Sequence, residues 1–130
     1  MKKMTFLLLF AGIGLSVYSL AEWCSSACSA THDYTLFGIA MGWVGIALFL
    51  MLSGCRIFVA RFPDLSVNRY IRWAYSGILA AALGAEAWFI WIQHAVIQSW
   101  CPVCLAIASV VLILCLLNAI EISISNCEPR

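Results

Sequence analysis

Four long apolar stretches fill most of this chain of 130 residues and limit the ways in which it can fold. Each is close to the ~20 residues that an α-helix needs to cross the hydrocarbon core of a membrane. Hydrophobic residues make up 65% of the sequence and charged residues only 10%, and a soluble domain of this size could not bury so much apolar surface. Because lipid offers no partners to backbone polar groups, we expect helices rather than strands. The stretches are Met4 to Ala21, Tyr34 to Cys55, Trp73 to Val96 and Pro102 to Ile120.

The basic residues predict how these spans are oriented. All seven fall on one side of the expected membrane, namely Lys2, Lys3, Arg56, Arg61, Arg69, Arg72 and Arg130. Short loops rich in Lys and Arg remain in the cytoplasm. We therefore expect an all-α membrane protein in which residues 1–130 form one four-helix transmembrane bundle with both termini cytoplasmic. A net charge of +1 without a basic run predicts no nucleic-acid partner.

Aromatic and small residues add detail to this topology. Trp and Tyr gather at membrane interfaces, and small residues allow helices to approach closely. The expected outer belt is Trp23, Trp88, Trp91 and Trp100, the inner belt is Tyr70, Trp73 and Tyr75, and the expected close-packing residues are Gly38, Gly42, Gly77, Ala81 and Gly84.

The first span has a second interpretation. Its basic start, apolar stretch and small residues at Ser19 and Ala21 are also typical of a cleavable signal peptide. We expect the span to be retained, because the apolar stretch is long for a signal peptide and three remaining helices would pack less well.

The predicted topology divides the seven cysteines by the side of the membrane on which they lie. Cys24 and Cys28 lie in the first outer loop, and Cys101 and Cys104 lie at the outer end of the fourth span. The outer four therefore face an oxidising compartment. The other three are expected to be small packing residues, and they are Cys55, Cys115 and Cys127.

The sequence WCPVC, residues 100–104, has the features of a thiol-exchange site. Pro102 suits the first turn of a helix, and residues three apart share a helix face, so Cys101 and Cys104 can bond or separate with little backbone movement. A helix start also favours the thiolate, which is the form that attacks disulfides.

The outer loop carries a second pair in CSSACSATHDY. A disulfide between Cys24 and Cys28 would close a short loop and stabilise the fold little, whereas an exposed exchange site is plausible there. Two pairs on one face predict a relay from a soluble dithiol through the loop pair to Cys101 and Cys104. The final acceptor would dissolve in lipid, and a quinone fits that requirement.

Two alternatives use the same four cysteines. They could form structural disulfides that staple a small membrane subunit, or they could join His32 and His94 in the metal site of a metal-binding or transport-associated protein. The second C-x-x-C of a typical zinc module is missing, so we expect no metal site.

The order of these parts resembles the bacterial vitamin K epoxide reductase family of membrane thiol oxidoreductases. The resemblance rests on four spans, a loop cysteine pair after the first, LFGIAMGWVG at the second and EAWFIWIQHAVIQSWCPVCLA between the third and fourth. The loop pair is spaced more tightly than is usual in that family. Disulfide bond formation protein B has the opposite order of pairs, with C-x-x-C in its first outer loop.

The resemblance implies a quinone-dependent thiol oxidase in the bacterial inner membrane, with either ubiquinone or menaquinone as cofactor. Its partner would be a separate periplasmic thioredoxin-fold protein that makes disulfides, since no such domain is fused to the chain. That partner would attack Cys24, Cys28 would pass electrons to Cys101, and Cys104 would face the quinone.

Three further residues are candidate quinone contacts. Glu86 is an ionisable side chain within the third span, where such residues are often functional, although it could instead be a neutral packing residue. His94 could donate to a quinone carbonyl or carry protons, or it could simply be solvated. Trp100 directly precedes Cys101.

Overall fold

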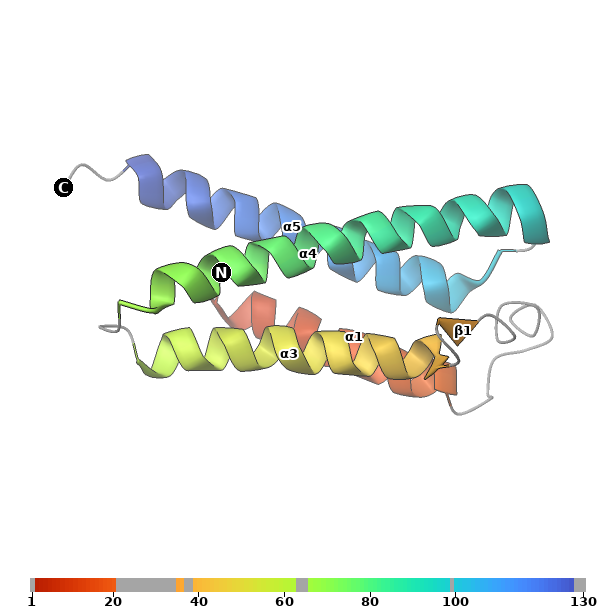
Figure 1. The fold of residues 1–130 in the computed structure, drawn as a ribbon, viewed down its shortest axis with the longest axis horizontal. Coiled ribbons are helices and arrows are strands. Elements are labelled where there is room, and N and C mark those ends of the chain that lie inside the picture. Colours follow the sequence, from red (N-terminus) through yellow and green to blue (C-terminus); the bar gives the residue numbers. More distant parts are fainter. Residues whose placement is uncertain (1, 21–34, 37–38, 63–65, 99, 128–130) are drawn as a thin grey trace.

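The chain folds into four long helices. The computed structural model describes residues 2–20, 35–36, 39–62, 66–98 and 100–127. The helices are α1 Lys2–Leu20, α3 Met41–Arg61, α4 Asn68–Ile92 and α5 Pro102–Cys127 (Figure 1). Each is long and apolar enough to cross a membrane, so the predicted all-α, four-span architecture is confirmed.

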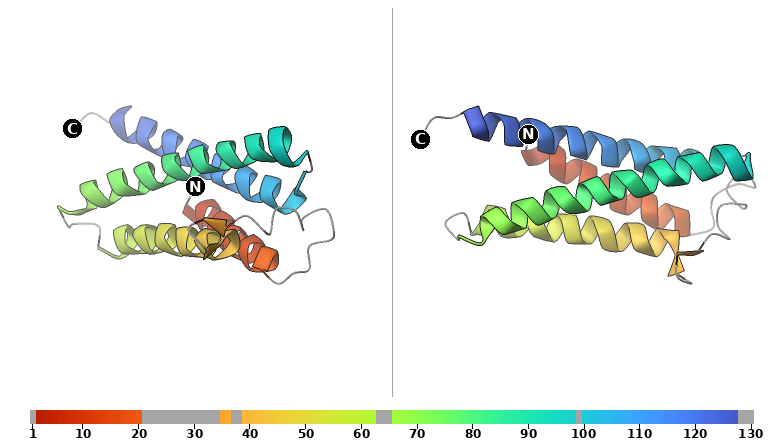
Figure 2. Two further views of the ribbon diagram at one scale, coloured as in Figure 1. Left: turned by 45° about the vertical axis from the view of Figure 1, so that its right-hand side comes forward. Right: turned by 45° about the horizontal axis from the view of Figure 1, so that its top comes forward.

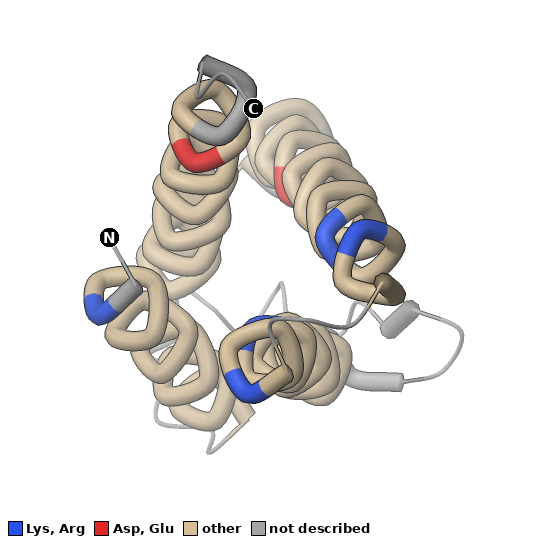
Figure 3. Tube along the Cα trace, turned by 90° about the vertical axis from the view of Figure 1, so that its left-hand side faces the viewer, with Lys and Arg blue, Asp and Glu red and all other residues tan. Residues whose placement is uncertain are grey.

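The helices form a ring in which each packs mainly on two others. α1 packs on α3 and α5, and α4 packs on α5 and α3. Both further views agree that α4 and α5 lie side by side and run in opposite directions (Figure 2). The start of α1 and the end of α5 lie toward one end of the bundle, and the Lys and Arg residues that the structure describes gather toward that end (Figure 3). We call it the basic end; the connection from α4 to α5 lies at the opposite end.

Three of the helices extend by five or more residues beyond the predicted spans, and α1 begins two residues before its span. α3 ends at Arg61 rather than at 55, α4 begins at Asn68 rather than at 73, and α5 continues to Cys127 rather than to 120. The apolar pattern marks only the residues that suit lipid, whereas a helix continues into the interface, where long basic side chains can reach water. The connection between α3 and α4 is correspondingly short.

The second predicted span also begins differently from our expectation. Residues Thr35–Leu36 form a short strand, β1, which pairs antiparallel with β2, Ile39–Ala40, before α3 starts at Met41. Thr and Ile are β-branched and favour strands. Helix is therefore the wrong prediction for this first part of the segment.

The core is built from large side chains of all four helices. Leu9, Phe49, Leu79 and Leu114 come from α1, α3, α4 and α5 in turn, and each is almost fully buried. Burial of such side chains away from the surrounding medium holds the helices in register.

Close packing between α1 and α3 depends on glycine. A Cβ atom added to Gly12 would collide with the ring of Phe49, and one added to Gly42 would lie 2.5 Å from the side chain of Leu20. Gly42 thus has its predicted role, whereas Gly38 lies outside the described residues. The prediction is wrong for Gly77 and Gly84, where an added Cβ would meet nothing within 4 Å.

The outside of the bundle is apolar, as a lipid-facing surface would be. Leu7 and Phe10 are each 69% exposed, although both lie in the middle of a helix. Tyr70 and Trp73 are exposed toward the basic end, and Trp88, Trp91 and Trp100 are exposed toward the other. Trp23 lies outside the described residues. Tyr75 is not part of an interfacial belt, because its side chain is only 3% exposed within the core.

Candidate functional site

The WCPVC segment forms the start of α5. Pro102 is the first helical residue, as predicted, and Cys101 directly precedes it. The carbonyl of Cys101 accepts a hydrogen bond from the backbone N–H of Leu105 at 3.1 Å, so Cys101 caps the helix. Its own N–H donates to Oε1 of Gln93 at 3.1 Å. A side chain at the end of α4 therefore fixes the start of α5.

The two cysteines of this segment are neighbours. Cys101 is 3% exposed and packs with Val103, while Cys104 is half-buried and packs against this small cluster. No disulfide joins them in the structure, and their side chains interact directly. The structure therefore describes the dithiol form of a pair whose spacing also permits a disulfide.

Gln93 is the polar centre of this site and was missed in the sequence. Its side chain is fully buried, and its Oε1 atom is occupied by the Cys101 N–H. Its Nε2 group has no well-aligned hydrogen bond to any described residue, although Cys104 lies within its electrostatic reach. A buried donor without a partner costs free energy, so such a group is expected to have a function. The signal in the sequence was that Gln93 is an amide placed about one helix turn after the apolar residues Trp88 and Phe89.

The backbone beside Gln93 departs from regular α-helix. A single π-helical turn, η1, runs from Gln93–Ile97 and is followed by Gln98 in the left-handed region with φ of 54°. π-turns are uncommon and often occur at functional sites. Here the turn ends α4 and leads the chain to Trp100 and Cys101.

The predicted quinone contacts fall into two groups. Glu86 is partly buried on α4 and lies within electrostatic range of Cys104. It precedes Gln93 by seven residues, or about two helical turns. His94 and Trp100 are exposed, and the centres of their rings lie 5.7 Å apart. The structure thus brings Glu86 toward the cysteine pair and pairs His94 with Trp100 at the surface.

The remaining cysteines lie elsewhere. Cys24 and Cys28 are outside the described residues, so the predicted loop pair is not placed. Cys55 and Cys115 pack against the core, and the Cys115 thiol donates to the carbonyl of Leu79 at 3.6 Å. Both have the packing role that we predicted, and the side chain of Cys127 is not described.

The described residues contain no cluster of three His, Cys, Asp or Glu side chains that could hold a metal ion. The metal alternative, however, requires Cys24, Cys28 and His32, which lie outside those residues.

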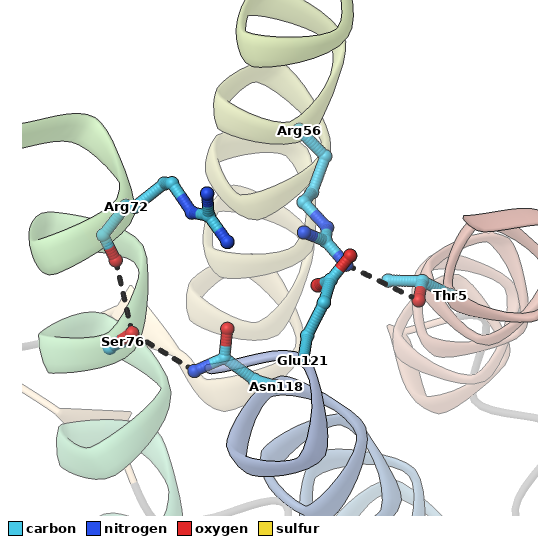
Figure 4. Close-up of polar contacts among 6 residues, drawn as sticks. All are labelled: Thr5, Arg56, Arg72, Ser76, Asn118 and Glu121. Carbon is cyan, nitrogen blue, oxygen red and sulfur yellow. Dashed lines mark hydrogen bonds and ion pairs between the residues drawn. The ribbon is translucent and has the colours of Figure 1, made fainter. Parts of the chain in front are cut away.

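A second polar cluster lies toward the basic end, and the sequence did not predict it. Arg56 of α3 forms an ion pair of 2.7 Å with Glu121 of α5 and donates to Thr5 of α1 at 3.5 Å (Figure 4). Its guanidinium also lies 5.1 Å from the centre of the Tyr75 ring. Nearby, Asn118 donates to Ser76 at 2.9 Å, and Ser76 donates to the carbonyl of Arg72 at 3.0 Å. These contacts join all four helices.

No model of a known protein family matches this sequence, and no curated protein matches it. The resemblance to the vitamin K epoxide reductase family therefore stays a prediction that rests on the residues quoted above.

Proposed function

We propose that this chain is a membrane thiol oxidoreductase that passes electrons from a dithiol protein outside the cytoplasm to a quinone in the bilayer. One observation carries the proposal: the Cys101 and Cys104 thiols lie together at a helix start, beside the buried side chain of Gln93, whose Nε2 group has no hydrogen-bond partner among the described residues. A structural pair needs no such donor, whereas a pair that cycles through a thiolate does.

The relay would transfer two electrons in each exchange. A thioredoxin-fold partner is oxidised to its disulfide as Cys24 and Cys28 become a dithiol. Cys28 then attacks Cys101 and expels Cys104 as a thiolate, after which Cys24 attacks Cys28 and releases Cys101. The loop disulfide is re-formed, and the membrane pair is left as a dithiol.

The residues around Cys104 suit a quinone as the final acceptor. A quinone, when bound, supplies a lipid-soluble acceptor of two electrons and two protons. Re-forming the Cys101–Cys104 disulfide releases that number of electrons and protons. The Nε2 group of Gln93 would be a donor for the Cys104 thiolate or for a carbonyl beside it. The Glu86 carboxyl lies within electrostatic range of Cys104, and in this proposal it takes up a proton.

The sidedness of the proposal follows from charge. With the basic end in the cytoplasm, the WCPVC segment lies at the outer face, where an oxidising compartment keeps disulfides. For a bacterial chain this arrangement corresponds to the inner membrane, with the partner in the periplasm.

The test is thiol-dependent quinone reduction by the purified, reconstituted protein. Adding a reduced thioredoxin-fold protein should bleach the quinone absorbance, and Cys104→Ala should abolish this turnover because the leaving thiol beside the acceptor is lost. Cys115→Ala is the matched control, since Cys115 packs within the same helix and should retain turnover.

Retained turnover in Cys104→Ala would contradict the proposal. Stoichiometric zinc or copper bound through the outer cysteines, without turnover, would favour the metal-binding alternative. Disulfides that never exchange with the partner would favour the structural one.

A further inference from the structure

We propose that a cleft at the basic end binds a phosphate group, held by Arg72 and Tyr75. The cleft lies among α3, α4 and α5 and is lined by Arg56, Arg72, Tyr75 and Asn118 together with apolar side chains and Cys55. It lies at the opposite end of the bundle from the cysteine pair and does not depend on the redox proposal.

The charges around the cleft favour an anion. Arg56 is compensated by Glu121 at 2.7 Å. Arg72 has no carboxylate partner among the residues that the structure describes, and its guanidinium extends toward Arg56 and Glu121 (Figure 4). One uncompensated positive charge is therefore left in the cleft. Arginine presents a planar set of donors that matches the oxygens of phosphate.

Tyr75 supplies a second, independent indication of a ligand. Its side chain is 3% exposed, yet its hydroxyl has no hydrogen-bond partner among the described residues. The hydroxyl lies within electrostatic range of Arg56, of its ion-pair partner Glu121 and of Cys55, and Arg56 and Cys55 line the same cleft. A buried phenol without a partner is costly, and an acceptor oxygen bound in the cleft would satisfy it.

The position of the cleft suggests where the phosphate comes from. The basic end is the part of the bundle that would meet the headgroups of the cytoplasmic leaflet, and anionic headgroups attract Arg residues there. A lipid phosphate and free inorganic phosphate present the same oxygens, so both fit the chemistry of the cleft. The two sources differ in whether the ligand is part of the bilayer.

The experiment measures lipid bound to the full chain in nanodiscs of phosphatidylcholine with increasing phosphatidylglycerol, using native mass spectrometry. Tyr75→Phe removes one hydroxyl and no charge, and it should weaken binding of phosphatidylglycerol about fivefold. Arg72→Gln should weaken it about tenfold or more. Addition of inorganic phosphate to discs of pure phosphatidylcholine provides the second arm.

Matched controls lie on the same helix. Tyr70 is 74% exposed, and neither Tyr70 nor Arg69 lines the cleft, so Tyr70→Phe should change nothing and Arg69→Gln should have only the smaller effect of a surface charge. Selective loss in the cleft variants supports the site. If phosphate alone binds in the second arm with the same dependence on Arg72 and Tyr75, the ligand is the free anion. Equal loss in the Arg69 and Arg72 variants, or unchanged binding in Tyr75→Phe, would overturn the proposal.

Discussion

Gln93 connects two helices through a single side chain. Because its Oε1 atom must accept from the Cys101 N–H, the orientation of the amide is fixed, and Nε2 has to point away from that bond. The nearby group that gains from a donor is Cys104 when it is a thiolate. One residue thereby holds the start of α5 and, in the proposed relay, would stabilise the charge that forms during exchange.

We predict that Gln93→Met lowers the kcat of quinone reduction about tenfold or more, because a hydrogen bond to a charged group is lost. The KM for the thioredoxin-fold partner should stay the same, since Gln93 is buried and cannot touch the partner. Steady-state kinetics of the reconstituted protein would measure both constants. Gln98→Gly is the control, because Gln98 is exposed and already has a positive φ that glycine favours. An unchanged kcat in Gln93→Met would show that the only role of the Gln93 amide is to fix the start of α5 through its hydrogen bond with the Cys101 N–H.

In the candidate site, the sequence could predict the residues whose roles depend on their separation along the chain. Cys101, Pro102 and Cys104 are defined by their separation along one helix. The roles of Gln93 and Tyr75 depend on how α4 ends and on which face of it is covered by other helices. A π-turn has no reliable sequence pattern, so the partner of Cys101 could not be inferred.

Among the elements, α1 and α3 show how the close approach of two helices depends on glycine residues, which have no side chain. Phe49 is fully buried against Gly12, and a Cβ atom added to Gly45 of α3 would lie 2.6 Å from the Ser16 hydroxyl of α1. Small residues let helices approach without the help of a hydrophobic driving force, which is weak in lipid. The sequence indicated small faces on the second and third spans, but it could not show which of them has a neighbour.

We predict that Gly12→Ala destabilises the bundle by about 1–3 kcal/mol, because the added methyl group must displace the Phe49 ring from a packed core. Gly14→Ala, two residues along the same helix, meets nothing within 4 Å and should be neutral or stabilising by up to about 1 kcal/mol. Thermal unfolding in detergent would compare the two variants with the unmodified chain. Equal stability of the two variants would contradict the packing that we describe.

At the scale of the whole molecule, the number of helices and their common basic end could be predicted from hydropathy and charge. The ends of the helices could not, because helices continue past the apolar residues into the interface. The ring of contacts and the Arg56–Glu121 pair were also beyond prediction, since they join residues far apart in the sequence; Arg56 and Glu121 are 65 positions apart. Hydropathy reveals which segments suit lipid and carries no information on which segments touch.

The orientation gives a prediction for intact cells. A membrane-impermeant maleimide, applied after mild reduction, should label Cys24 or Cys28 and should not label Cys127, which ends α5 at the basic end. Permeabilised cells provide the control, because Cys127 should then react. Labelling of Cys127 in intact cells would contradict the predicted orientation, and the partner would then have to lie on the opposite side of the membrane from the one proposed.

Helix α4 also sets a length. Arg72 lies in its first turns and Gln93 directly follows its last residue, so the two are 21 residues apart. This separation corresponds to about 32 Å of helix, which is close to the ~30 Å hydrocarbon thickness of a typical bilayer. A thinner or thicker membrane would have to deform, or the bundle would have to tilt, to keep both polar ends near the membrane interfaces. Hydrophobic mismatch would therefore act on both ends of the bundle at once, so that bilayer thickness alone would alter the proposed thiol exchange and the proposed headgroup binding together.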